Sequence, residues 1–171
     1  MTARLRCAFR PAALLALVLG LTGCFKSEAP LIDKASAKFP FQTITLTIDG
    51  ETEVLTRDGD VYRRTENDKP SEATLLIHEI AENLFIVQES QPEGEATYLF
   101  ARKQDDKVIV RSDCKGLDAD MLARLNIDTP KTEKKIFLSC QIKGLEALIG
   151  LGQSPDLWSG ETQTLQIVSM E

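Results

Sequence analysis

The feature that most constrains the fold is a series of short strand-like runs separated by tight turns. In Thr43–Ile48, isoleucine and leucine alternate with threonine, which is the two-residue period of a half-buried strand. Asp49-Gly50 and Asp58-Gly59 each lie between two such runs, and this dipeptide is a strong hairpin signal. Turns this short join antiparallel neighbours, because parallel strands need a long crossover connection.

The same reasoning predicts a meander of about seven strands over the first two thirds of the chain. Its runs are 43–48, 53–57, 61–65, 73–80, 84–89, 96–103 and 107–111. Several of them, such as Leu84-Phe85-Ile86-Val87, are apolar on both faces, so we expect helices or a second sheet to cover part of the second face.

The last third is expected to supply two short helices. Apolar residues recur there at helical spacing in two groups: Leu117, Met121, Leu122 and Leu125, then Leu145, Leu148 and Ile149. Further strands are expected at 135–142 and 163–168. The predicted class is therefore α+β and β-rich: an antiparallel meander of about seven or more strands, forming a curved sheet or half-barrel, with two short helices in the C-terminal third.

The amino terminus has the pattern of a secretory signal. Arg4, Arg6 and Arg10 precede an apolar, uncharged run over residues 12–21. That run is about half as long as the roughly 20 residues that a membrane-spanning helix needs. It is therefore expected to be a targeting segment and not a permanent span.

The signal ends in Leu21-Thr22-Gly23-Cys24, which resembles the bacterial lipobox: an aliphatic residue, two small residues and a cysteine. The resemblance implies removal of residues 1–23 as a signal peptide, a diacylglycerol on the sulfur of Cys24 and a fatty acyl group, typically palmitate, on the new amino terminus. The alternative is a chance cysteine near the end of an ordinary signal. Several acyl chains would give stable membrane anchoring.

The resemblance also bears on location. Phe25 stands where an aspartate would resemble the inner-membrane retention signal of enterobacteria. A Gram-negative cell would then carry the protein on the periplasm-facing side of its outer membrane, and any other bacterium on the extracellular face of its cell membrane.

Residues 24–40 are polar and contain Pro30 and Pro40, which is typical of a lipidated tether, and residues 41–171 are expected to form a single globular domain. Three of the 20 Lys and Arg residues precede Cys24 but none of the 26 acidic residues does, so the mature charge is 17 − 26 = −9. Such a charge disfavours nucleic acid as a partner. The membrane is expected to be reached through the lipid anchor.

Cys114 and Cys140 are the two cysteines left once Cys7 is removed and Cys24 carries lipid. In an oxidising, secreted context they are expected to form a disulfide. Each stands before a Lys-Gly-Leu sequence that could begin a helix, so the bridge would join two junctions between a strand and a helix. A redox-active pair is the less favoured alternative, because such pairs usually have a C-x-x-C spacing.

No motif for catalysis, a cofactor or a metal is present, so none of the three is predicted. The single histidine, His78, lies in the middle of a predicted strand, where a structural role is favoured over a catalytic one. Its neighbour Glu79 would point to the opposite face, which argues against an acid–base pair. The aromatic and apolar residues Phe39, Phe41, Leu157 and Trp158 are candidates for a partner patch, or else for the ends of the core.

Three functions remain open. In general layout the chain resembles the small β-rich lipoproteins of bacterial envelopes, among them assembly accessories and lysozyme inhibitors, which implies a non-enzymatic binding or assembly module with an envelope protein or lipid as partner. The second function is a carrier of a lipophilic ligand, which would explain strands that are apolar on both faces. The third is a hydrolase that uses carboxylates.

Overall fold

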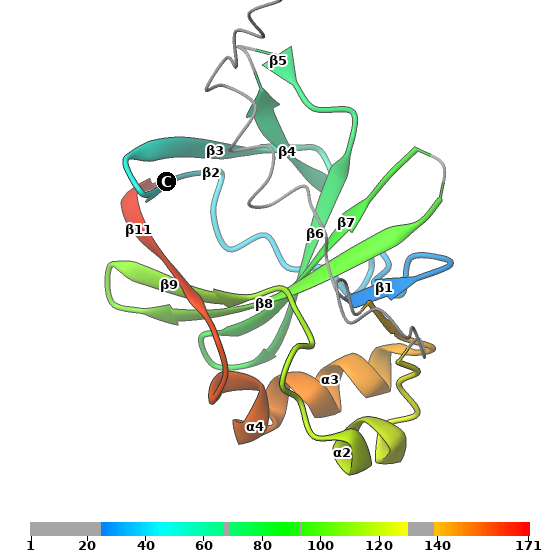
Figure 1. The fold of residues 1–171 in the computed structure, drawn as a ribbon. Helices are drawn as coiled ribbons and strands as arrows, with labels where there is room; N and C mark the ends of the chain where they lie inside the picture. Colours follow the sequence, from blue (N-terminus) through cyan, green and yellow to red (C-terminus); the bar gives the residue numbers. More distant parts are fainter. Residues whose placement is uncertain (1–24, 67–68, 93, 130–138) are drawn as a thin grey trace, which may run out of the picture.

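The computed structural model describes residues 25–66, 69–92, 94–129 and 139–171. Its elements are shown in Figure 1. The strands are β1 (Phe25–Ser27), β2 (Thr43–Ile48), β3 (Glu51–Asp58), β4 (Val61–Glu66), β5 (Lys69–Pro70), β6 (Thr74–Ala81), β7 (Leu84–Ser90), β8 (Ala96–Gln104), β9 (Lys107–Arg111), β10 (Cys140–Gln141) and β11 (Gln163–Met170). The helices are α2 (Ala119–Arg124), α3 (Leu145–Gln153) and α4 (Pro155–Trp158).

Eight of the described strands follow one another around a barrel, in the order β8, β7, β6, β4, β3, β2, β11, β9. The ring closes because β9 pairs with β8 on one side and with β11 on the other. All of these pairings are antiparallel, and the junction of β4 with β6 is the narrowest, with Tyr62 opposite Leu75. The predicted antiparallel, curved meander is confirmed.

The turn between β2 and β3 shows how an Asp-Gly sequence fixes the register of the two strands that it joins. Asp49 and Gly50 have φ values of 51° and 86°. A two-residue turn with positive φ at both positions matches the right-handed twist of the strands that it joins.

The best-packed core lies outside the barrel wall. Figure 1 shows the three helices gathered on one side of the barrel. The outward side chains of Ile86 and Phe100 are fully buried there, together with Leu148 and Leu151 of α3. The helices therefore cover the second apolar face of β7 and β8, which is one of the two kinds of cover that the sequence allowed. None of the helices in the described part of the chain is long and apolar enough to span a membrane.

The helices α2 and α3 lie at the two predicted positions, whereas α4 is a third helix that the sequence did not predict. Asp118 is the N-cap of α2 and its carboxylate accepts a hydrogen bond from the backbone N–H of Met121 at 2.8 Å. Helix α3 continues past Gly150 through Gly152. A Cβ atom on Gly152 would lie only 2.5 Å from the side chain of Ile80 and 3.0 Å from the ring of Phe100. Gly152 thus permits close packing of α3 on the barrel and does not end the helix.

The structure differs from the expectation of a polar tether over residues 24–40. Residues 25–38, here called the N-terminal strap, lie on the outer face of the barrel, where β1 pairs with β8 and β10. Phe25 is fully buried and its ring meets that of Phe100 edge to face, with centroids 5.2 Å apart. Ile32 is 2% exposed. These apolar contacts form only with the folded wall, so local composition did not indicate them.

Cys114 and Cys140 form the predicted disulfide, with their Cα atoms 6.3 Å apart. Cys140 lies in β10, which runs parallel to β1, and Cys114 lies between β9 and α2. The bridge therefore joins the region after β9 to the strand beside the N-terminal strap. Of the strand predicted at 135–142, the structure describes β10, and residues 135–138 lie outside the described part.

Candidate ligand site in the barrel interior

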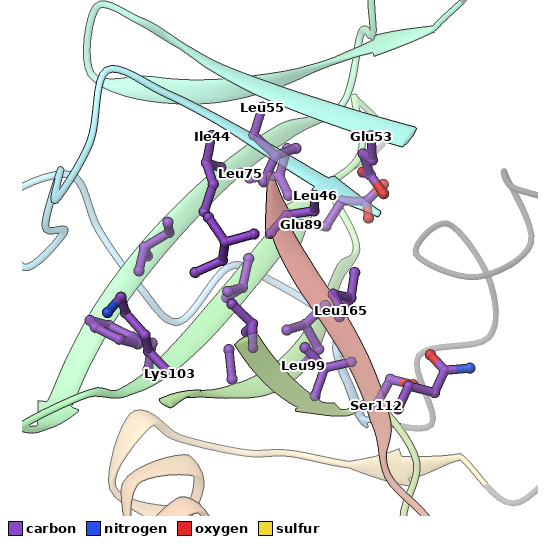
Figure 2. Close-up of a pocket in the computed structure, with 18 of the residues that line it drawn as sticks. Ile44, Leu46, Glu53, Leu55, Leu75, Glu89, Leu99, Lys103, Ser112 and Leu165 are labelled. Carbon is purple, nitrogen blue, oxygen red and sulfur yellow. The ribbon is translucent and has the colours of Figure 1, made fainter. Parts of the chain in front are cut away.

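The interior of the barrel holds a partly open cavity of about 690 Å³, which is within the range of small-molecule sites. Figure 2 shows apolar side chains from β2, β3, β6, β8 and β11 that line it. An eight-stranded barrel is just wide enough either to be filled by its own side chains or to hold one small ligand. The apolar lining consists mainly of Ile44, Leu46, Leu55, Leu75, Ile77, Phe85, Val87, Leu99, Ala101, Val108, Val110, Leu165 and Ile167.

The two faces of the barrel wall differ in how deeply their side chains are buried. Along β8 the outward residues Tyr98 and Phe100 are at most 2% exposed. The inward Leu99, in contrast, is only half-buried, as is Val87 opposite it on β7. In a strand, consecutive side chains face opposite sides, so the two faces of the wall have different roles. The outer face packs against the rest of the chain, and the inner face borders the cavity.

Three charged side chains line one end of the cavity. Arg64 on β4 contacts Glu53 on β3, with Nε 2.7 Å from the carboxylate oxygen, and donates a hydrogen bond from Nη2 to Glu89 on β7 at 3.0 Å. All three are between 5% and 7% exposed. We call Glu53, Arg64 and Glu89 the lumen triad. One guanidinium and two carboxylates carry a formal charge of −1, which is costly to bury unless it is compensated.

The strand register explains how the lumen triad assembles. Glu53 lies opposite Leu46, and Arg64 opposite Leu55, so both belong to the inward-facing set of their strands. Glu89 follows Phe85 and Val87 at the two-residue period of β7. Its second carboxylate oxygen accepts a hydrogen bond from Nε2 of Gln91 at 3.1 Å.

Lys103 lies toward the other end of the cavity. It is on β8, and Thr97 of the same strand is paired with Glu89. Since a strand rises about 3.3 Å per residue, the Cα atoms of Thr97 and Lys103 are about 20 Å apart. In Figure 2, Glu53 and Lys103 lie on opposite sides of the view. The cavity is therefore apolar in its middle, acidic at one end and basic at the other.

An aromatic pair, Phe41 and Tyr62, lies beside the apolar part of the lining. Phe41 stacks at a tilt on Tyr62, with ring centroids 4.6 Å apart, and the hydroxyl of Tyr62 donates to the carbonyl of Phe41 at 2.7 Å. Burial raises the pKa of Tyr62, an effect that its hydrogen bond with Phe41 only partly offsets. The segment that leaves the N-terminal strap, Pro40 and Phe41, thereby becomes part of the cavity lining.

The candidate partner patch does not present four exposed side chains. Phe39 and Phe41 pack on Tyr62, whereas Leu157 is fully buried in the core under the helices. Trp158 is half-buried, with the guanidinium of Arg102 4.2 Å from its ring centroid. Leu157 cannot contact a partner, because α4 turns it inward. For the half-buried Phe39, Phe41 and Trp158 the partner patch remains a prediction.

His78 is on the outer face of β6, under the N-terminal strap. Its Nδ1 lies 2.9 Å from the carbonyl oxygen of Ser36 and shares a hydrogen bond with it. Glu79 is exposed and lies next in the strand, with its side chain on the opposite face. His78 is thus placed to hold the strap and is not brought to the cavity.

Cys24, the predicted lipidation site, lies outside the described residues. Among the described side chains, no group of three or more His, Cys, Asp or Glu residues is placed to hold a metal ion.

Sequence reasoning missed the lumen triad. The available signal was a charged residue in phase with apolar ones: Glu89 follows Phe85 and Val87 at even spacing, and Glu53 precedes Leu55. The partnership itself joins three strands that are distant in sequence, so only the barrel brings the charges together.

No protein-family model, curated protein or solved structure matches this chain.

Proposed function

We propose that this protein is a lipid-anchored protein of the bacterial envelope that binds a lipophilic molecule inside its barrel. The observation that carries the proposal is the cavity of about 690 Å³, whose middle is lined by aliphatic side chains. Transfer of an apolar ligand from water into such a space is favourable by about 25 cal/mol for each Å² of apolar surface removed from water.

The arrangement of polar groups supports binding more than hydrolysis. Glu53 and Glu89 both contact Arg64, so their carboxylates are engaged in ion pairs. His78 lies on the other side of the wall, against the N-terminal strap. The carboxylate-dependent hydrolase therefore has less support than the ligand carrier.

The amino-terminal sequence supports a location beside lipids. The lipobox-like Leu21-Thr22-Gly23-Cys24 would place the domain on a membrane surface, where lipophilic molecules are abundant. Metabolic labelling with an alkyne fatty acid tests this anchor. The wild-type chain should be labelled and the Cys24→Ala variant should not, and equal labelling of the two would refute acylation of Cys24.

Binding is tested by extracting lipophilic molecules from the purified full chain and measuring them by mass spectrometry. Leu99→Trp, which places a large side chain in the cavity, should lose the co-purifying molecule. Val168→Trp is the matched control, because Val168 is 60% exposed on the outside of the barrel. Both variants should keep a cooperative unfolding transition. Equal amounts of the same molecules in wild type and both variants would show that they are bound elsewhere.

A further inference from the structure

The lumen triad points to the chemistry of the ligand's polar end. Its three side chains lie at one end of an apolar cavity, and each is more than nine-tenths buried. A ligand that fills the middle of the barrel with a hydrocarbon chain would therefore bring one of its ends to these charges. An amphiphile, with a polar head and an apolar tail, fits this distribution.

The net charge of the lumen triad indicates which kind of polar head group the ligand has. The lumen triad carries a formal charge of −1, and its three side chains are almost fully buried, so electrostatic effects there are larger than in bulk water. A cationic head would bring the charge of the head and the triad together to zero. An anionic head would add a second negative charge at the triad. Repulsion between these like charges would disfavour its binding.

The remaining charged lining residues leave this preference in place. Asp113 is paired with Arg111, with Nη2 3.3 Å from the carboxylate oxygen. Lys103 lies toward the opposite end and is the described lining residue to which an anionic head would be drawn. The lumen triad and Lys103 therefore make opposite predictions about the head group, which an experiment can separate.

We infer that the barrel binds a single-chain amphiphile with a cationic amine head, its tail lying among the aliphatic side chains and its head at the lumen triad. This inference rests on the proposed function, since it assumes that the cavity holds a lipophilic ligand. The triad is chosen over Lys103 because its three members are almost fully buried, whereas Lys103 is half-buried. A cationic head group is therefore stabilised most at the triad end of the cavity.

The test uses two photoactivatable probes with the same alkyl chain and a diazirine in it, one ending in a primary amine and the other in a carboxylate. The full chain is placed in vesicles of zwitterionic lipid at pH 7 and irradiated with each probe. Labelled peptides are then mapped by mass spectrometry. Labelling of peptides that line the cavity, such as those with Leu99 and Leu165, is normalised to labelling of the lipid.

We expect the amine probe to label the cavity about tenfold more than the carboxylate probe, the effect of one hydrogen bond to a charged group. Glu89→Gln and Glu53→Gln each make the lumen triad neutral and should remove most of that preference. Glu95→Gln is the matched control, because Glu95 is exposed just before β8 and outside the cavity lining. Thermal unfolding verifies that each variant is folded.

Two results would overturn the inference. Equal labelling by the two probes, or stronger labelling by the carboxylate that is lost in Lys103→Met, would place the head elsewhere and leave the proposed function intact. Absence of cavity labelling by both probes would contradict the proposed function and the inference with it. The comparison of the two probes on the wild-type chain needs no variant, so the test holds even where a substitution impairs folding.

Discussion

The side-chain amide of Gln88 is hydrogen-bonded to the backbone of Ile32 in both directions. Its Oε1 accepts from the N–H of Ile32 at 2.8 Å, and its Nε2 donates to the carbonyl of the same residue at 3.0 Å. Oε1 also accepts from the N–H of Leu31 at 2.7 Å. Gln88 is 1% exposed, so one side chain on β7 supplies the buried strap backbone with partners that a neighbouring strand would otherwise provide.

Replacement of Gln88 by leucine should therefore destabilise the protein by about 2–3 kcal/mol, since it leaves buried backbone groups without partners. Urea unfolding measures this loss. Hydrogen exchange should rise first in the N-terminal strap. Gln104→Leu, at an exposed position at the end of β8, is the control and should change little. Similar exchange of the strap in wild type and Gln88→Leu would contradict the assigned role of Gln88.

Tyr98 should make the fold sensitive to alkaline pH. Its hydroxyl lies 2.6 Å from Oγ of Ser27 and accepts from the N–H of Leu31 at 3.1 Å. Burial raises the pKa of Tyr98, and these hydrogen bonds lower it by less. Below the unfolded pKa of about 10 the stability from the neutral phenol is fully present. Above it the unfolded chain ionises first, so stability is lost as pH rises through the folded pKa.

The measurement is the free energy of unfolding between pH 8 and pH 11. Tyr98→Phe should be less stable than wild type at pH 8 by about 1–2 kcal/mol, because Ser27 and Leu31 lose a buried partner. Its stability should then fall less steeply above pH 10, with Tyr62 responsible for part of the remaining slope. Parallel curves for wild type and Tyr98→Phe would argue against a raised pKa at this residue.

The Cys114–Cys140 bridge should contribute about 3–4 kcal/mol in the chain-entropy model, since it closes a loop with a sequence separation of 26. Urea unfolding of the wild type should show this loss on addition of a reductant. The Cys114→Ser, Cys140→Ser double variant should match the reduced wild type and not respond to the reductant. Peptide mapping without reduction that finds both thiols free would remove the basis of the prediction.

Gly152→Ala should destabilise the protein even though alanine is the better helix former. A Cβ atom would collide with Ile80 and Phe100, and overpacking of this kind costs about 1–3 kcal/mol. The gain in helix propensity is about 1 kcal/mol. Gly144→Ala is the control, because its Cβ would meet no atom within 4 Å. Greater thermal stability of Gly152→Ala than of wild type would show that α3 moves away from the wall at little cost.

Local sequence patterns predicted the strands well and the closed barrel less well. The runs 84–89, 96–103 and 107–111 agree with β7, β8 and β9 within one residue at each end, because a two-residue period and turn residues are local signals. Closure depends on β11, which is distant in sequence from β2 and β9 and pairs with both. A curved sheet and a closed barrel have the same local pattern, so the sequence did not distinguish them.

The N-terminal strap and Gly152 show a second limit. Polar residues and two prolines around Ile32 indicate a tether, and nothing in the sequence around Gly152 indicates that this position must lack a side chain. Contacts with the barrel decide both points: Gln88 binds the strap backbone, and Phe100 leaves little room for a side chain at residue 152. These contacts depend on the barrel wall against which each segment packs, so the sequence of the segment alone does not predict them.

The burial of Phe25 has a consequence for how far the protein can reach. A flexible tether over residues 25–40 would add about 20 Å of reach above the lipid. With Phe25 fixed in the core, a lipid on Cys24 would begin one residue from the folded wall. The radius of gyration expected for a domain of this size is about 15 Å. With the proposed anchor and ligand, the barrel would reach only molecules within one domain diameter of the bilayer, and the leaflet beneath it would be their source.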